Sequence, residues 1–177
     1  MKPAVPLLAL CLLLCSAALS AREKALVAPG PAKVQVAFQG DCETLVLESI
    51  EGAQRELLLA VFSFTRTNIA KALVEAQERG VDVQLKLDEF QAKSKYSQSA
   101  LAVLKKAKIP IEHIAMPPYS SMHHKFMVVD RREVLTGSYN FTTKATTDNY
   151  ENLMRISSGE VSRAYYNQWQ AIKGKKK

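Results

Sequence analysis

Cysteine is scarce in this chain of 177 residues, which has three, at positions 11, 15 and 42. No CxxC pair occurs, and no cluster of cysteine and histidine has the spacing of a zinc site. Removal of an N-terminal leader would leave Cys42 alone, and one thiol cannot form an internal disulfide. A disulfide framework is therefore excluded, and the fold must depend on a hydrophobic core. Cys42 lies in an apolar helical stretch, where we expect a buried small hydrophobic residue.

Aromatic residues are also few, at 7% with a single Trp. The chain lacks an aromatic-rich run of the kind on which single-strand binders stack bases, which leaves Tyr96 and Tyr119 as candidate stacking residues. Charge is one-sided, because 24 Lys and Arg against 17 Asp and Glu give a net charge of +7. That excess favours a polyanionic partner, either nucleic acid or anionic lipid headgroups.

A long apolar run occurs at the N-terminus, where Lys2 is followed by an apolar stretch centred on Leu7 to Leu14. Ala18 and Ser20 stand at the −3 and −1 positions of a cut before Ala21. The pattern predicts a secretory signal peptide over residues 1–20 and a periplasmic or secreted protein. The alternative is a retained membrane anchor, but the run is short for a span of ~20 residues. After cleavage we expect no stable membrane association.

The remaining chain is predicted to be a flexible lead-in (21–32), one domain (33–172) and a basic tail (173–177). Apolar periodicity alternates between strands and helices: strands 34–38, 56–64, 81–87, 122–129, 132–136 and 152–156, and helices 41–52, 67–80, 98–105 and 158–172. The near-continuous apolar run at 56–64 indicates a strand covered on both faces. The order of elements predicts an α/β fold, with a mixed, largely parallel central β-sheet flanked by helices in a single domain.

The most informative run is Ser121 to Phe141, in which His123, Lys125 and Asp130 spell H-x-K-x-x-x-x-D. On a strand, residues two apart share a face and lie ~7 Å apart. An imidazole and an ammonium at that distance suit one phosphate group. His123 can attack the phosphorus while Lys125 neutralises the oxygens. His124 has the opposite parity, and we expect it to pack or to face solvent.

Five further residues accompany this pair. Gly137 permits close backbone approach, and Ser138 and Asn140 can donate hydrogen bonds to phosphate oxygens. Glu151 is the candidate carboxylate that orients a catalytic imidazole through its second nitrogen. Asp130 lies at a predicted hairpin turn, where a carboxylate more often satisfies turn amides or a neighbouring arginine.

A phosphodiester displacement through histidine needs a nucleophile and an acid for the leaving oxygen. One H-x-K motif supplies only the first. The economical arrangement is a twofold homodimer in which two copies of His123 face each other across one phosphate. Neither a metal nor a cofactor is required, and Asp88 with Glu89 is interpreted as a pair of solvated strand-end acids.

The run from His123 to Glu151 resembles the HKD motif of the phospholipase D superfamily, in particular the small EDTA-resistant bacterial endonucleases with one motif per chain. The segments that carry the resemblance are FSFTRTNIAKAL, RGVDVQLKLDE, the HKD run, GSYNFT and NYEN. It implies a phospholipase D-like fold and a phosphohistidine at His123. It also implies phosphate binding by Lys125, Ser138 and Asn140, a hydrogen bond from Glu151 to an active-site histidine, and a supporting role for Asp130. Arg66 departs from the Ser-Pro type loop of many relatives.

Together these features predict a metal-independent, non-specific endonuclease of DNA or RNA. The alternatives are a phospholipase D-type hydrolase of an anionic phospholipid and a decayed nucleic-acid-binding protein. For the nuclease, we expect backbone contacts from a group of lysines near the site: Lys93, Lys95, Lys105, Lys106 and Lys108.

Overall fold

The computed structural model describes residues 30–174. The predicted signal peptide (1–20), nearly all of the lead-in (21–32) and the last three residues of the tail (173–177) lie outside the described residues. The elements are β1 (Lys33–Phe38), α2 (Asp41–Gly52), β2 (Glu56–Val61), α3 (Thr67–Glu78), β3 (Asp82–Asp88), α4 (Glu89–Ala92), α5 (Gln98–Lys106), β4 (Ile111–Ile114), β5 (Lys125–Val129), β6 (Glu133–Gly137), α6 (Thr143–Thr147), β7 (Asn152–Ser157) and α7 (Gly159–Ala171).

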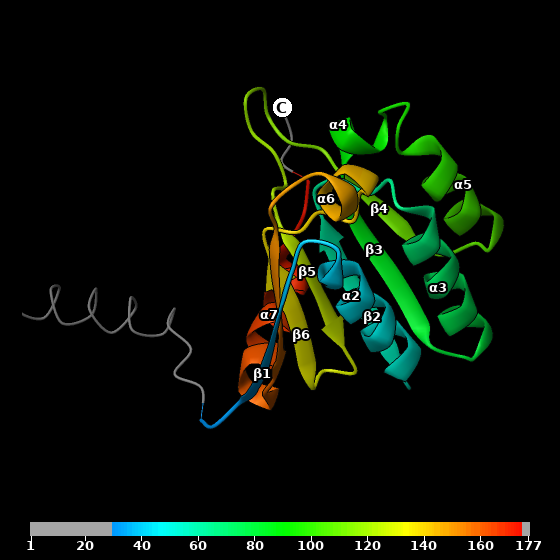
Figure 1. The fold of residues 1–177 in the computed structure, drawn as a ribbon. Coiled ribbons are helices and arrows are strands. Elements are labelled where there is room, and N and C mark those ends of the chain that lie inside the picture. The colour runs from blue at the N-terminus through cyan, green and yellow to red at the C-terminus, as the bar shows by residue number, and fades with distance from the viewer. Residues whose placement is uncertain (1–29, 175–177) are drawn as a thin grey trace, which may run out of the picture.

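The strands form one seven-stranded sheet in the order β1-β7-β6-β5-β2-β3-β4. Helices α2, α3 and α5 cover one face, and α7 covers the other (Figure 1). The predicted mixed α/β single domain is thus confirmed. Within residues 30–174, no helix is long and apolar enough to cross a membrane.

The prediction that the sheet is largely parallel is wrong. Only β2–β3 and β3–β4 pair in parallel, whereas β1–β7, β2–β5, β5–β6 and β6–β7 are antiparallel. Strand–helix alternation, which favours parallel pairing, ends with β4 (a short strand that the sequence patterns missed). The chain then returns as β5 beside β2 in the opposite direction, and β6, β7 and β1 continue the antiparallel half.

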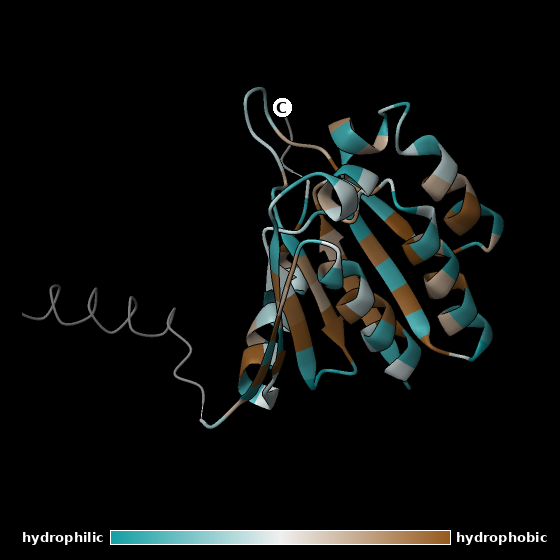
Figure 2. Ribbon diagram, in the orientation of Figure 1, coloured by the Kyte–Doolittle hydropathy of each residue, from teal (hydrophilic) through white to brown (hydrophobic). Residues whose placement is uncertain are grey.

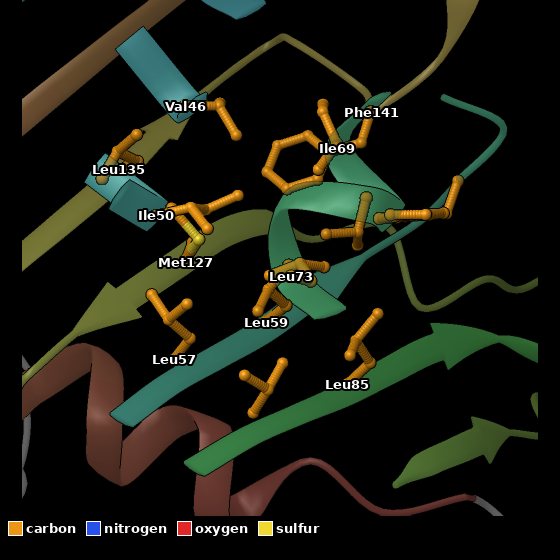
Figure 3. Close-up of a cluster of buried hydrophobic side chains, with 14 of the residues drawn as sticks. Val46, Ile50, Leu57, Leu59, Ile69, Leu73, Leu85, Met127, Leu135 and Phe141 are labelled. Atoms are coloured by element: carbon orange, nitrogen blue, oxygen red, sulfur yellow. The ribbon is translucent and has the colours of Figure 1, made fainter. Parts of the chain in front are cut away.

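The central strand β2 contributes to two hydrophobic cores. Leu57, Leu59 and Val61 pack toward α2 and α3, while Leu58 and Ala60 pack toward α7. Side chains alternate between faces along a strand, so both faces of β2 must be apolar, as its sequence predicted. Figure 3 shows the larger core, to which Cys42 also belongs with no exposed surface, as expected. In β3, hydrophobic and hydrophilic residues alternate (Figure 2).

One of the hydrophilic residues of β3, Lys86, is buried beneath α7 and fixes the C-terminal end of that helix. Its ammonium lies 4.3 Å from the ring centroid of Trp169, donates to the carbonyl of Ile172 at 2.9 Å and pairs with Glu112 at 3.2 Å. The indole of Trp169 donates to the carbonyl of Leu59 on β2 at 3.0 Å. A buried charge is tolerated only with such partners. The last turn of α7 therefore has a defined position on the sheet.

Asp130 anchors the β5–β6 turn to the connection between α2 and β2. Its carboxylate accepts backbone N–H bonds from Gln54, Arg55 and Glu56 at 3.0, 2.7 and 3.0 Å. Burial opposes ionisation of this carboxyl, but the three amides and the charge of Arg55 together lower its pKa. Asp130 follows the last residue of β5, and Lys125 is the first, so the two are separated by ~17 Å along the strand. Asp130 therefore satisfies backbone amides at the turn, as its position predicted, and takes no direct part at the His123–Lys125 pair.

We predict that Asp130→Asn lowers the free energy of unfolding by roughly 2–3 kcal/mol at neutral pH, because a neutral amide accepts these bonds more weakly than a carboxylate. Asn tolerates the left-handed backbone of residue 130 (φ 52°), so the turn itself is preserved. Urea denaturation across a pH series measures the effect. The folded-state pKa is depressed, so the wild-type advantage is present above the pKa of the unfolded chain and disappears as pH falls through the folded value. A difference that grows on acidification would contradict this role.

Gly137 ends β6 where that strand comes very close to β7. A Cβ atom placed on it would lie 2.2 Å from the carbonyl oxygen of Asn152 and 2.9 Å from Cα of Leu153. Both are backbone atoms that cannot move independently of the sheet. The glycine therefore sets the separation of β6 and β7 at the end where residues 138 and 151 follow and precede the two strands.

Gly137→Ala is expected to destabilise the fold by about 1–3 kcal/mol, the usual cost of forcing extra atoms into a packed site. Gly159→Ala is the matched control, since a Cβ there meets nothing within 4 Å. Thermal unfolding of both variants makes the comparison. Equal melting temperatures for the two would show that β6 and β7 can separate freely.

Candidate active site

The predicted site residues gather at one end of the sheet. Because β5 runs antiparallel to both β2 and β6, its first residue lies beside the last residues of those strands, as in the pair Val61↔Lys125. Gly137 pairs with Leu153, which places the start of β7 at the same end. The topology thus brings residues 123–125, 138 and 151 together from distant parts of the chain.

His123 and Lys125 are in direct contact. The Lys125 ammonium lies 3.3 Å from each ring nitrogen of His123 and donates to the His123 carbonyl at 3.1 Å. His123 is exposed and lies two residues before β5, which begins at Lys125 rather than at residue 122 as predicted. The two side chains remain in contact although the strand begins later than predicted. Burial lowers the pKa of Lys125, and the charge of Glu151 partly opposes that effect.

Phe62 is a site residue that the sequence patterns did not single out. Its ring lies 4.6 Å from the imidazole of His123 (centroid to centroid) and 5.2 Å from the Lys125 ammonium. Its backbone N–H donates to the carbonyl of His124 at 2.8 Å. Phe62 directly follows β2, and its apolar neighbours suggested a core residue. Only the antiparallel pairing of β2 with β5 reveals that it supports the His–Lys pair.

Asp88 holds the chain just before His123. One carboxylate oxygen accepts the backbone N–H of Met122 at 3.0 Å, and the other caps α4 through the N–H of Gln91 at 3.1 Å. The side chain is buried, so the interpretation of Asp88 as a solvated strand-end acid was wrong. It ties the segment of residues 115–124 to the end of β3.

Glu151 is hydrogen-bonded to Ser138 and Asn149 rather than to a histidine. The Ser138 hydroxyl donates to one carboxylate oxygen at 2.5 Å, and the Asn149 amide donates to the other at 3.0 Å. The same hydroxyl accepts the backbone N–H of Asn152 at 3.1 Å. Ser138 therefore orients Glu151 in this structure. The structure does not show the predicted hydrogen bond between Glu151 and His123.

Asn140 follows in the same loop, and its side-chain oxygen is buried without a hydrogen-bond partner among the described residues. Buried polar groups are usually paired, so an unpaired one beside a candidate site is informative. A half-turn of the amide exchanges its oxygen and nitrogen. Asn140 can thus present an N–H donor to an anion, as its predicted phosphate-binding role requires.

His124 is exposed, and one side of its ring packs against Phe126, which agrees with the expectation that it packs or faces solvent. Its ring lies 5.3 Å from that of Phe126 in an edge-on arrangement and 3.3 Å from the Gln168 amide, measured between Nε2 atoms. Burial, together with the charges of Lys125 and His123, lowers its pKa. His124 is therefore held neutral more firmly than a solvated histidine at neutral pH.

The group of lysines predicted to approach the site is divided by the fold. Lys93 and Lys95 follow α4, at the end of the sheet that carries His123. Lys105, Lys106 and Lys108 lie at and just after the C-terminal end of α5, and β4, which follows, begins beside Leu85 in the middle of β3. A role for these three lysines in the approach of the substrate stays a prediction.

Arg66, which departs from the Ser-Pro type loop of many relatives, makes a bidentate ion pair with Glu43 of α2. Both N–H···O distances are 2.8 Å. This hydrogen bonding raises the pKa of the guanidinium and joins the start of α3 to α2. Arg66 is therefore a structural residue.

Within residues 30–174, no three His, Cys, Asp or Glu side chains lie close enough together to hold a metal ion.

Comparison with known proteins agrees with this geometry. Residues 46–173 match the family model described as cardiolipin synthase, PLD-like domain. The chain is 31% identical over 134 residues to a protein named phospholipase D of Rickettsia bellii, covering 76% of this chain and 65% of that one. It is 33% identical over 128 residues to the human mitochondrial cardiolipin hydrolase, covering 72% and 49%. The chain thus spans less than two thirds of the length of these relatives.

Two solved structures share the fold of this chain. Nuc from Salmonella typhimurium, described as a phospholipase D family member, superimposes with a TM-score of 0.75 at 32% identity, over 80% of this chain and 94% of that one. NucT from Helicobacter pylori shares the fold with a TM-score of 0.70 at 23% identity, over 80% and 96%. With the family model matched over most of the chain and the fold shared, this protein belongs to the phospholipase D superfamily.

Proposed function

We propose that this protein is a phosphodiesterase, and specifically a non-specific endonuclease of DNA or RNA that acts through a covalent phosphohistidine and needs no metal. The observation that carries the proposal is the exposed imidazole of His123 in contact with the Lys125 ammonium, 3.3 Å from each ring nitrogen. A cation at that position neutralises the oxygens of a phosphate whose phosphorus the imidazole attacks.

The reaction takes place in two displacements. In the first, a nitrogen of His123 forms a bond to phosphorus, the P–O bond to the leaving alkoxide breaks, and an acid supplies that oxygen with a proton. In the second, a base takes a proton from water, the resulting oxygen bonds to phosphorus, and the N–P bond breaks. Lys125 and the amide of Asn140 stabilise the charge on the phosphoryl oxygens in both steps.

The acid is best supplied by a second copy of the chain. His113 lies on β4, three strands away from β5 or ~14 Å at the usual strand spacing. His124 has a lowered pKa and is hydrogen-bonded to Gln168, which makes it a poor proton donor at neutral pH. A homodimer that places the partner subunit's His123 opposite the first would supply both the acid and the later base. In that arrangement Glu151 can serve the partner's imidazole.

Nucleic acid is the favoured substrate for two reasons. The net charge of +7 attracts polyanions, and Lys93 and Lys95 lie at the end of the sheet that carries the site. Contacts of this kind bind the backbone and not the bases, so cleavage should be non-specific and inhibited by salt.

A second candidate function, hydrolysis of an anionic phospholipid, is favoured by the names of relatives. Phospholipase D of Rickettsia bellii and the human mitochondrial cardiolipin hydrolase share about a third of their aligned residues with this chain. The same histidine chemistry would serve a lipid phosphodiester. The two functions differ in substrate and not in the proposed catalytic residues.

The proposal is tested with the purified protein in EDTA, on supercoiled plasmid, on oligonucleotides and on vesicles of cardiolipin in phosphatidylcholine. We expect nucleic acid to be cut, and His123→Ala to lower the rate at least ~10³-fold, as expected for loss of a covalent nucleophile. His113→Ala is the matched control, an exposed histidine far from the site that should leave the rate unchanged.

The outcomes separate the candidates. Cleavage of lipid but not of nucleic acid, with the same dependence on His123, would replace the nuclease with the phospholipase. Binding of nucleic acid without cleavage of any substrate would indicate a decayed site. Undiminished cleavage by His123→Ala would refute the mechanism itself.

Phe62→Leu is predicted to reduce kcat about 3- to 10-fold, because it removes the aromatic face that holds His123 and Lys125, and such contacts contribute roughly 0.5–1.5 kcal/mol. Phe62→Tyr retains the face and should restore activity. Steady-state kinetics on a short oligonucleotide, with KM measured separately, gives the comparison. Equal kcat in Leu and Tyr variants would mean that Phe62 only fills space.

A further inference from the structure

A cavity of about 460 Å³ opens beside His123, between the segment of residues 115–124 and the last turn of α7. Its volume falls within the ~300–1,000 Å³ range of small-molecule sites. Both walls are held in place. Asp88 fixes the loop wall at Met122, and Lys86 fixes the helix wall at Ile172. The cavity is therefore part of the folded structure.

The lining combines an apolar base with a polar rim. Ile114, Met122 and Ile172 are all buried and form the base. The rim carries groups that can donate or accept hydrogen bonds: Ser121, His123, His124, Gln168 and Lys173. Flat aromatic ligands with polar edges suit such a surface, because methionine contacts their faces and amide or hydroxyl groups pair with their edges.

A second hollow of about 410 Å³ lies on the other side of the His124–Gln168 contact and includes Lys125 and Gly137. His123 lines both hollows. A phosphate bound at His123 and Lys125 would therefore have one flanking unit of its substrate directed into each hollow. The second hollow contains the phosphate-binding lysine, so the first is the one free to accept a non-phosphate group.

We propose that the cavity between residues 115–124 and the end of α7 is a nucleobase pocket, which receives the base of a nucleotide next to the scissile phosphate. An acyl chain would fit the pocket less well, because it would leave the Ser121 hydroxyl and the Gln168 amide oxygen without hydrogen-bond partners on binding. The inference rests on the proposed nuclease function and adds to it a substrate class. A base inside a duplex cannot reach such a pocket without leaving the stack. The enzyme should therefore act on single strands.

Ala171 allows a direct test, because its exposed side chain lines the cavity on α7. Ala171→Trp fills the pocket from the helix side, away from His123 and Lys125. Gln170→Trp is the matched control, since the neighbouring position is equally exposed and lines neither hollow. Circular dichroism and thermal unfolding establish that both variants are folded.

The substrate is a short single-stranded oligothymidylate with one abasic unit at its centre, and product mapping compares each phosphate with its distant neighbours in the same molecule. In the wild type, the phosphate on one side of the abasic unit should be cut about tenfold more slowly, the size expected for loss of one base contact. Gln170→Trp should keep that difference. Ala171→Trp should cut intact sites about tenfold more slowly and should abolish the difference.

Equal cleavage by the wild type at the phosphates on both sides of the abasic unit and at distant ones would refute the nucleobase pocket without affecting the proposed nuclease function. So would an equal rate on duplex and single strand, or an Ala171→Trp variant that retains the abasic effect. Failure to cut any oligonucleotide, with formation of phosphatidic acid and phosphatidylglycerol from cardiolipin vesicles, would instead remove the nuclease on which the pocket depends.

Discussion

The antiparallel pairing of β5 with β2 is the constraint on which the site depends. It places the end of β2 against the start of β5, so that Phe62 contacts both His123 and Lys125. If β5 ran parallel to β2, the His–Lys pair would lie at the other end of the sheet, beside the loop that Asp130 now secures. The orientation of this one strand thus places the candidate active site and the turn at Asp130 at opposite ends of the sheet.

The parallel and antiparallel halves of the sheet contribute different parts of the core and of the site. The parallel half, β2-β3-β4, carries the larger core with α3 and α5, and the carboxyl end of β3 supplies Asp88, which fixes the backbone at Met122. The antiparallel half supplies the polar groups, Ser138 after β6 and Glu151 before β7, which Gly137 allows to approach. The candidate active site lies where the halves meet, and α7 covers the face of the sheet opposite to α2, α3 and α5 (Figure 1).

Much of this could be predicted from the sequence. Local patterns identified the helices from Asp41, Thr67 and Ser158, the two-sided strand β2 and the turn at Asp130, because periodicity and turn residues act over short distances. The contact of His123 with Lys125 was also predictable, because the two are near neighbours in the chain. Strand directions beyond β4 were not, because pairing partners far apart in sequence leave no local signal. The same holds for Phe62, Asp88 and Gln168, whose roles arise only from tertiary neighbours.

Long-range pairing also explains why the predicted contacts of two residues differ from those in the structure. Asp130 belongs to the sequence motif but lies at the opposite end of the sheet, where it accepts backbone N–H groups of the connection that leads into β2. Glu151 is near Lys125 in space but hydrogen-bonded to Ser138 and Asn149, a choice between polar partners that sequence cannot resolve. In each case the residue type indicated a polar role, but the position in the sequence did not reveal which groups the side chain would contact.

The central claim is that a nitrogen of His123 becomes bonded to phosphorus during turnover. Rapid-quench mass spectrometry of the protein mixed with a stoichiometric oligonucleotide tests it most directly. A phosphoryl adduct that forms and decays at the rate of turnover, on the peptide that contains His123, is the expected result. Turnover without any adduct on that peptide, or an adduct on another residue, would contradict it.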